Sequence, residues 1–205
     1  MQQPHAVLLL GPTGCGKTPL GQHLEAHGFR GHRCAHFDFG AELRRAAAAQ
    51  PAASDLAETQ HATILHALRT GALLEDRDFP IAATLLCRFV AERQLGPDDR
   101  LILNGLPRHI GQAAALDKLL CIETVLSLEA TPEVIHRRIS SNSGGDRVGR
   151  TDDALPAVTA RLNTFRQRTI PLLDHYRARG ANILAVPVDE QTTPEAILRR
   201  LDGNP

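Results

Sequence analysis

The residues best suited to chemistry form the segment GPTGCGKT, at positions 11 to 18. It matches the pattern G-x-x-x-x-G-K-[ST] and lies between an apolar run and a stretch with helical periodicity, which is the context this pattern requires. Its glycines let backbone N–H groups converge on phosphates, Lys17 places a point charge on the β- and γ-phosphates, and the Thr18 hydroxyl is suited to ligate Mg²⁺. The segment therefore predicts binding of ATP with Mg²⁺. The predicted cofactor-binding residues of this loop are Gly11, Gly14, Cys15, Gly16, Lys17 and Thr18.

The use of lysine supports this prediction. Only Lys17 and Lys118 are lysines, so 21 of the 23 lysines and arginines are arginines. A chain that almost always uses arginine therefore has a compact ammonium at the one position where a slim charge is needed. The loop indicates a nucleotide but not a reaction, because kinases, ATPases and GTPases share it.

Two further segments carry arginines at places suited to hold anions. LILNGLPRHIGQ, residues 101 to 112, runs from an apolar strand into a proline that fixes the backbone before Arg108, and a helix bearing Gln112 follows. SSNSGGDRVGR, residues 140 to 150, is polar and glycine-rich and contains two arginines. We interpret this second segment as a mobile loop that closes on an anion rather than as a disordered linker.

The elements that position these segments follow from the hydrophobic pattern. Short apolar runs alternate with longer stretches of helical periodicity, which is typical of a parallel sheet covered by helices. We predict an α/β fold, a three-layer P-loop architecture with a five-stranded parallel sheet. The predicted strands are 6–10, 34–39, 100–104, 123–129 and 181–188, and the predicted helices are 17–28, 40–49, 54–70, 80–94, 109–120, 131–140, 153–178 and 193–202.

The second and third predicted strands are separated by a segment with three helical stretches, which is longer than a crossover helix needs. We therefore predict a single domain with an inserted helical subdomain at about 39–96 and a short lid at about 140–150. The core would comprise residues 1–38, 97–139 and 151–205.

Composition argues against several classes of function. Lys+Arg and Asp+Glu both total 23, and a formal net charge of zero does not suggest a surface for nucleic acid or anionic membranes. The N-terminal apolar run is too short for a signal peptide or a membrane span. The four cysteines are scattered without a C-x-x-C pair, so we expect reduced thiols in a cytoplasmic protein. We also expect a monomer.

Three segments beyond the P-loop resemble the adenylate kinase family of nucleoside monophosphate kinases, and together they span nearly the whole chain. HFDFGAELRR, from residue 36, is similar to the family's Ser-Thr-Gly-Asp-x-x-Arg segment. NGLPRHIGQ, from residue 104, resembles its Asp-Gly-(aromatic)-Pro-Arg-x-x-x-Gln. GRTDDALPAVTARL, from residue 149, resembles its Gly-Arg-x-Asp-Asp lead into a helix with a further arginine. The resemblance implies transfer of the ATP γ-phosphoryl group to a nucleoside monophosphate, with AMP as the expected acceptor.

The resemblance also implies which residues hold the acceptor. Arg44 and Arg108 would clamp the α-phosphate of the monophosphate. Gln112, one helical turn beyond Arg108, would hydrogen-bond its base, which favours a purine. The predicted substrate-binding residues are Phe39, Gly40, Arg44, Gly105, Arg108 and Gln112.

On the donor side, the resemblance places Arg138 against the ATP base. Arg150 and Arg161 would reach the transferring phosphoryl group from the lid side. Arg147 is the candidate to replace a lid arginine whose aligned position here is Asn142, and it joins Arg138 in the cofactor-binding set. The lid contains no cysteine and therefore resembles the short form without zinc. The predicted catalytic residues are Lys17, Arg108, Arg150 and Arg161.

Some positions depart from the family pattern. Phe39 and Ala41 replace Thr and Asp, so the hydrogen bond usually assigned to the monophosphate base is lost and an aromatic face is offered instead. Asn104 replaces an Asp on the Mg²⁺ side, and an amide orients a water but brings no charge. Losing one charge-assisted hydrogen bond, about 1.5 to 3 kcal/mol, slows an enzyme roughly ten- to a hundredfold. Asp38 ends the second predicted strand, and we predict that it supplies the absent carboxylate, because such strand ends converge on the same crevice. The predicted metal-binding residues are Thr18 and Asp38.

Two alternatives remain open from the sequence. Phe39 and Ala41 favour a P-loop kinase that acts on another small phosphorylated or hydroxylated metabolite. Asn104, Ala41 and Asn142 together favour a nucleotide-binding regulatory relative with weak or no kinase activity.

Overall fold

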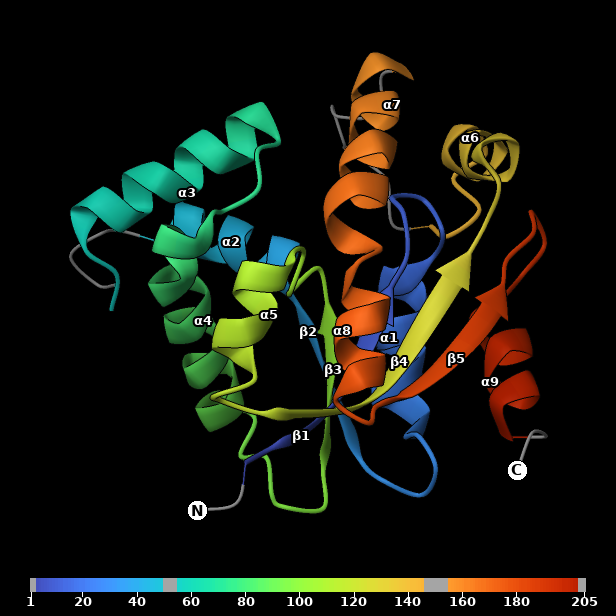
Figure 1. Ribbon diagram of the computed structural model, residues 1–205, viewed down its shortest axis with the longest axis horizontal. Coiled ribbons are helices and arrows are strands. Elements are labelled where there is room, and N and C mark those ends of the chain that lie inside the picture. The colour runs from blue at the N-terminus through green and yellow to red at the C-terminus, as the bar shows by residue number, and fades with distance from the viewer. Residues whose placement is uncertain (1–2, 50–54, 146–154, 203–205) are drawn as a thin grey trace.

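The fold is a parallel five-stranded sheet between two layers of helices (Figure 1). The computed structural model describes residues 3–49, 55–145 and 155–202. All strand pairs are parallel, and the strand order is β2-β3-β1-β4-β5, which confirms the predicted fold class. The strands are β1 (His5–Leu10), β2 (Cys34–Asp38), β3 (Arg100–Asn104), β4 (Cys121–Glu129) and β5 (Asn182–Pro187).

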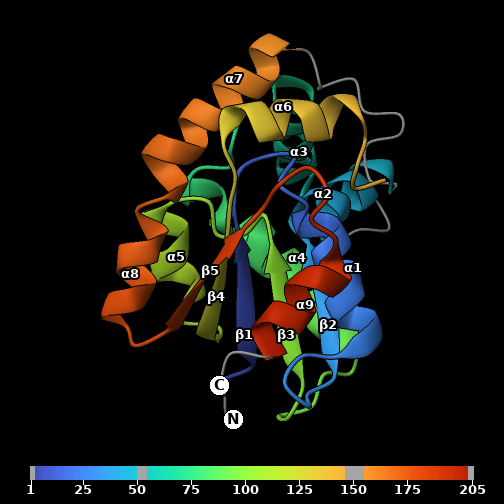
Figure 2. The ribbon, with the colours of Figure 1, turned by 90° about the vertical axis from the view of Figure 1, so that its right-hand side faces the viewer.

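Burial of both faces of the sheet explains why the strands read as continuous apolar runs. Alternate residues of β1 enter two separate cores, with Leu8 in one and Leu9 in the other. Figure 2 shows the sheet edge-on between the two helical layers. One core contains residues of α2 (Phe39–Ala48), α3 (Glu58–Thr70), α4 (Phe79–Glu92), α5 (Ile110–Leu116) and α8 (Leu172–Ala178), and the other contains residues of α1 (Lys17–His27), α6 (Pro132–Ser140), α7 (Leu155–Thr164) and α9 (Pro194–Asp202).

The chain between β2 and β3 contains α2, α3, the short 3-10 helix η2 (Asp76–Asp78) and α4, in agreement with the three helical stretches predicted there. Helix α3 begins later than predicted. Its first residue is Glu58, and the side chain of Gln60 accepts a hydrogen bond from the backbone N–H of Ala57. This bond satisfies a backbone donor that the first turn of the helix leaves without a partner.

The prediction of one continuous helix over 153–178 is wrong in the described part. Helix α7 ends at Thr164, a π-helical segment η3 (Phe165–Thr169) follows, and α8 begins only at Leu172. Pro171 explains the interruption, because it has no N–H to donate and its ring clashes with the carbonyl of an α-helical neighbour. The predicted helix 109–120 also ends earlier, at Leu116, since the chain turns there to enter β4.

All four cysteines are free thiols, as predicted. Among the described residues, no helix combines the length and the apolar character needed to cross a bilayer.

A buried histidine lies between α1 and β2. An added Cβ at Gly21 of α1 would lie 2.3 Å from the imidazole of His36, so the ring packs directly on the helix backbone. His36 is 8% exposed, and its Nε2 has no hydrogen-bond partner within the described ranges. Burial lowers the pKa of His36; the nearby carboxylates of Asp38 and Glu25 oppose this shift, and Arg93 adds to it.

This lowered pKa predicts acid sensitivity. The unfolded chain binds a proton at His36 near its usual pKa of about 6.5, whereas the folded protein does not. The stability contributed by the neutral ring is therefore complete above that pH and is lost as the pH falls, by at most about 1.4 kcal/mol per pH unit. Denaturant unfolding at pH 7.5 and 5.5 should show a smaller loss for His36→Gln than for the wild type. The exposed His66 provides the matched control, His66→Gln, which should keep the full loss.

Candidate active site

The P-loop joins the end of β1 to the start of α1. Gly14 and Gly16 have φ values of 82° and 96°, in the left-handed region that favours glycine. An added Cβ at Gly14 would lie 2.7 Å from Ile139, so a larger residue does not fit there without a shift. The loop is therefore shaped by its glycines, and its last turn leads directly into the N-terminus of α1.

Lys17 folds back over this loop. Its Nζ donates hydrogen bonds to the carbonyl oxygens of Gly11 at 2.8 Å and of Pro12 at 2.7 Å. Desolvation lowers the pKa of Lys17, the charge of Arg108 lowers it further, and the neighbouring Cys15 opposes the shift. The ammonium is held at the centre of the loop, where phosphates bind in proteins with this motif.

Three polar side chains meet beside the P-loop. Asp38 and Asn104 end the neighbouring strands β2 and β3 in paired positions, and Thr18 comes from the first turn of α1. The Thr18 hydroxyl donates to Asp38 Oδ2 at 2.9 Å, and Asn104 Nδ2 donates to the same oxygen at 2.8 Å and to Thr18 Oγ1 at 3.0 Å. Asp38 Oδ1 accepts from the N–H of Ala41 at 2.9 Å and caps α2. We call Thr18, Asp38 and Asn104 the polar cluster.

The polar cluster fits a magnesium ion by its chemistry. Hydroxyl, carboxylate and amide oxygens are hard ligands of the kind that Mg²⁺ prefers, together with water and substrate phosphates. The carboxylate is supplied by Asp38 of β2, and the side chain that ends β3 is an uncharged amide. A carboxylate oxygen of Asp38 therefore lies 2.9 Å from the Thr18 hydroxyl, although position 104 carries no charge.

A cleft of about 220 Å³ opens over the P-loop and the polar cluster. Its walls come from α2, from the segment after α3 and from α7. In Figure 1, α3 and α7 stand apart above the sheet. The cleft brings together all predicted substrate-binding residues with Lys17 and Arg161: Phe39, Gly40, Arg44, Gly105, Arg108 and Gln112.

Positive charge dominates this cleft. Lys17, Arg44, Arg108 and Arg161 all line it, and Asp38 is the acidic residue among its described lining residues. Desolvation lowers the pKa of Arg108, the charge of Arg161 lowers it further, and Asp38 opposes the shift. Guanidinium groups that lie close enough to repel one another indicate an anion-binding site, because a bound anion neutralises that repulsion.

Two of the predicted substrate-binding side chains are largely enclosed. Phe39 is only 5% exposed because its ring stacks on Phe37, with centroids 6.1 Å apart, so little of its face is offered to the cleft. Gln112 is 1% exposed, its Nε2 donates to the carbonyl of Leu74 at 2.8 Å, and its Oε1 accepts from the N–H of Arg108 at 2.8 Å. In this structure Gln112 holds the wall of the cleft together.

Arg138 lies on another side of the P-loop, next to a second hollow of about 220 Å³ lined also by Cys15 and Gly16. The guanidinium is buried, and its Nη1 donates to the carbonyl oxygens of Asp189 at 2.7 Å and Thr192 at 3.2 Å, while Nε donates to Gly14 at 3.3 Å. It thereby fixes the loop between β5 and α9 against the P-loop.

Arg147 and Arg150 lie outside the described residues. Sequence reasoning missed another group next to the cleft, which comprises Glu75, Arg168 and Thr169. Its members come from segments far apart in the sequence, and no local pattern distinguishes them from solvated polar residues.

A P-loop at the carboxyl edge of the sheet, with an arginine-lined cleft between α2 and α7, is typical of a P-loop phosphotransferase. No model of a protein family matches the chain. The adenylate kinase of Synechococcus sp. strain WH7803 is 34% identical over 204 residues, which cover 97% of each chain. That of Synechococcus sp. strain CC9311 is 32% identical over 205 residues, or 96% of each chain, and that of Parvibaculum lavamentivorans is 30% identical over 183 residues, or 85% of this chain and 80% of the relative.

The chain belongs to the adenylate kinase family, as a divergent member. It is an ATP-dependent phosphotransferase of the nucleoside monophosphate kinase class.

Proposed function

We propose that the protein transfers the γ-phosphoryl group of ATP to AMP and forms two molecules of ADP, with Mg²⁺. The observation that carries this proposal is the convergence of four basic side chains and the polar cluster in one cleft. Two nucleotides bring several phosphate charges together, and catalysis of their reaction rests mainly on positioning and electrostatic stabilisation. The names of the relatives, all adenylate kinases, support AMP as the acceptor.

Each part of the cleft has a role in this proposal. Lys17 holds the β- and γ-phosphates of ATP, and Arg138 and the hollow beside it take the ATP base. Arg44 and Arg108 hold the acceptor phosphate so that its oxygen attacks the γ-phosphorus in line. Arg161 neutralises the charge that develops on the transferring group.

The polar cluster would hold Mg²⁺ through Thr18 and Asp38. When bound, the metal ion neutralises charge on the β- and γ-phosphates. We also propose that residues 39–96 form the acceptor-binding part of a single domain and that residues 140–150 form its lid. The segment 71–74 supports the first assignment, because it lines the same cleft as the P-loop.

The acceptor is tested with purified protein, ATP, Mg²⁺ and AMP, GMP, CMP or UMP in turn, with diphosphate formation as the measurement. We expect turnover with AMP. Turnover with a different acceptor alone would replace AMP in the proposal. ATP binding without product for any acceptor would favour a regulatory relative.

A substitution on α2 tests the acceptor site itself. Arg44→Gln should raise the KM for AMP by about tenfold, since a charge-assisted hydrogen bond contributes roughly 1.5 to 3 kcal/mol, and leave the KM for ATP unchanged. The neighbouring Arg45 pairs with Glu42 and Glu92 and is absent from the cleft lining, so Arg45→Gln is the matched control. Equal effects of the two substitutions on the KM for AMP would contradict the role of Arg44.

A further inference from the structure

The π-helical segment η3 contacts the acceptor side of the cleft through its last two residues. Arg168 and Thr169 reach two different segments of the chain, one before α4 and one before α5. Segments of π-helix are rare and often lie at functional sites. In this chain η3 directly follows α7, the helix that bears Arg161.

The first contact concerns the backbone of Arg108. The hydroxyl of Thr169, which is buried, donates to the carbonyl oxygen of Arg108 at 2.8 Å. On the other side of the same residue, the N–H of Arg108 donates to Gln112 Oε1 at 2.8 Å. Both polar backbone groups of Arg108 are therefore held by side chains, one from η3 and one from α5.

The second contact concerns the wall of the cleft. Gln112 Nε2 donates to the carbonyl oxygen of Leu74 at 2.8 Å, and His109 Nε2 lies 3.2 Å from the same oxygen. The next residue, Glu75, accepts two hydrogen bonds of 2.7 Å each from the guanidinium of Arg168, one on each carboxylate oxygen. Such a bidentate pair fixes direction as well as distance.

Together these contacts form a closed ring. It runs from Thr169 through Arg108, Gln112 and Leu74 to Glu75, and returns through Arg168 to Thr169. Every link is a hydrogen bond between side chain and backbone, an ion pair or a peptide bond. Glu75 and Arg168 lie 93 residues apart in the sequence, so the ring joins the segment between α3 and α4 to η3.

We propose that Arg168 and Thr169 are positioning residues for the acceptor site: they fix Arg108 and the wall at residues 74–75 relative to α7. This inference rests on the proposed function, because it takes the cleft to be the acceptor site. An exposed ion pair contributes little to stability by itself, so the role we assign lies in geometry. A shift of the wall or of Arg108 weakens the grip on the acceptor phosphate and leaves the P-loop contacts with ATP in place.

The proposal predicts an effect on the KM for AMP and not on the KM for ATP. Glu75→Gln and Arg168→Gln should each raise the KM for AMP by about fivefold or more, within the range of a lost charge-assisted hydrogen bond, with less than a twofold change in the KM for ATP. The double variant should be no worse than either single variant, because each removes the same link. Thr169→Val should act in the same direction, and Thr169→Ser, which keeps the hydroxyl, should restore the wild-type KM.

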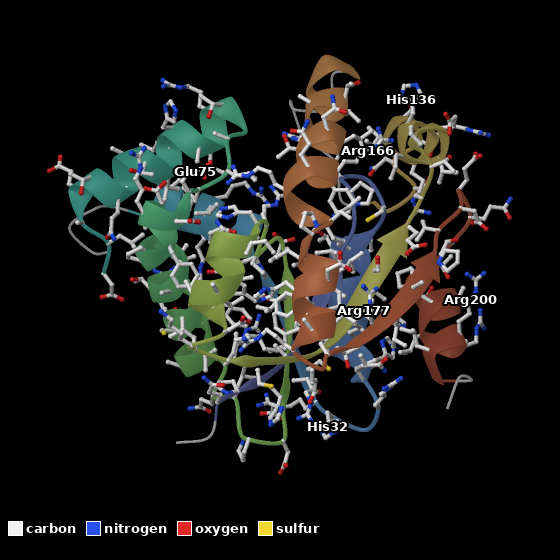
Figure 3. The ribbon with its side chains drawn as sticks, viewed as in Figure 1. His32, Glu75, His136, Arg166, Arg177 and Arg200 are labelled. Atoms are coloured by element: carbon white, nitrogen blue, oxygen red, sulfur yellow. The ribbon has the colours of Figure 1, made fainter. Side chains whose placement is uncertain are left out.

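Arg166 provides the matched control. It lies on η3 but lines a groove on the side toward α6, whereas Glu75 lies on the side toward α3 (Figure 3). Arg166→Gln should leave both KM values unchanged. A purely structural role would instead change the KM for ATP, the KM for AMP and the unfolding temperature together, and that result would overturn the proposal, as would unchanged or additive effects of the Glu75 and Arg168 variants.

A measurement without ligand separates this inference from the proposed function. Amide hydrogen exchange of residues 72–78 should be faster in Arg168→Gln and Glu75→Gln than in the wild type and in Arg166→Gln. If the wild type does not phosphorylate AMP, the proposed function fails, and this exchange still tests the ring. Equal exchange in all four proteins would overturn the ring whatever the acceptor.

Discussion

Replacing Lys17 by methionine should lower kcat by about 10²- to 10³-fold, the loss typical of removing a charge that stabilises a transition state. Methionine keeps most of the length and apolar character of the side chain and removes the ammonium. In the structure this ammonium lies over the P-loop and donates to the carbonyl oxygens of Gly11 and Pro12. The rate of ADP formation at saturating ATP and AMP is the measurement.

The chain offers an unusually clean control. Lys118, the other lysine, is exposed near the start of β4, and Lys118→Met should retain full activity. A lysine-directed reagent can label only these two side chains and the N-terminus, so protection of Lys17 by ATP can be followed directly. Lys17→Arg should not restore the rate, because the planar guanidinium is larger and differently shaped. A Lys17→Met protein with near wild-type kcat would refute the phosphate-binding role.

Much of the fold could be predicted because its determinants are local. The buried parallel strands appear as short apolar runs, and the P-loop motif indicates the strand and the helix that flank it. The prediction of one helix over 153–178 was wrong because of a single residue. Pro171 lies inside the predicted helix 153–178, and the structure has a π-helical segment and a break there.

The placement of the site was predictable for a related reason. The carboxyl ends of parallel strands meet at one edge, so Asp38 and Asn104 had to lie near the P-loop. The partners of the buried Gln112 were not predictable, because its bonds to Leu74 and Arg108 depend on how the inserted segment folds onto α5. Similarly, the pair of Glu75 with Arg168 arises only from the tertiary arrangement.

A substitution in the polar cluster should also lower the rate strongly. Asp38→Asn should reduce Mg²⁺-dependent activity by about ten- to a hundredfold, the value of one charge-assisted interaction of roughly 1.5 to 3 kcal/mol. Asparagine is also a good helix N-cap, so the bond from Ala41 that begins α2 can be kept and the fold should survive. The amide nitrogen that replaces Oδ2 cannot accept the hydrogen bonds of Thr18 and Asn104, so a lower rate would reflect the loss of the carboxylate oxygen beside Thr18 together with its charge. An unchanged rate would contradict the assignment of Asp38 as a ligand of the metal ion.

The reverse change at the end of β3 should behave differently. In Asn104→Asp, an oxygen would take the place of the amide nitrogen that now lies 2.8 Å from Asp38 Oδ2, so two carboxylates would face each other. Their repulsion should destabilise the protein without metal, and a divalent cation should relieve it. We expect a larger rise of the unfolding temperature on adding Mg²⁺ than in the wild type, together with a higher kcat. A rise equal to that of the wild type would contradict this view.

The double variant Asp38→Asn with Asn104→Asp separates charge from position. It keeps one carboxylate, one amide and the hydrogen bond between them, but exchanges the strands that carry them. If the polar cluster needs one negative charge beside Thr18, the exchange should recover most of the activity that Asp38→Asn alone loses. Titration of Mn²⁺ by electron paramagnetic resonance, with and without ATP, gives the affinity independently of turnover. Recovery of Mn²⁺ affinity without recovery of the rate would show that the position of the carboxylate, and not only its charge, determines catalysis.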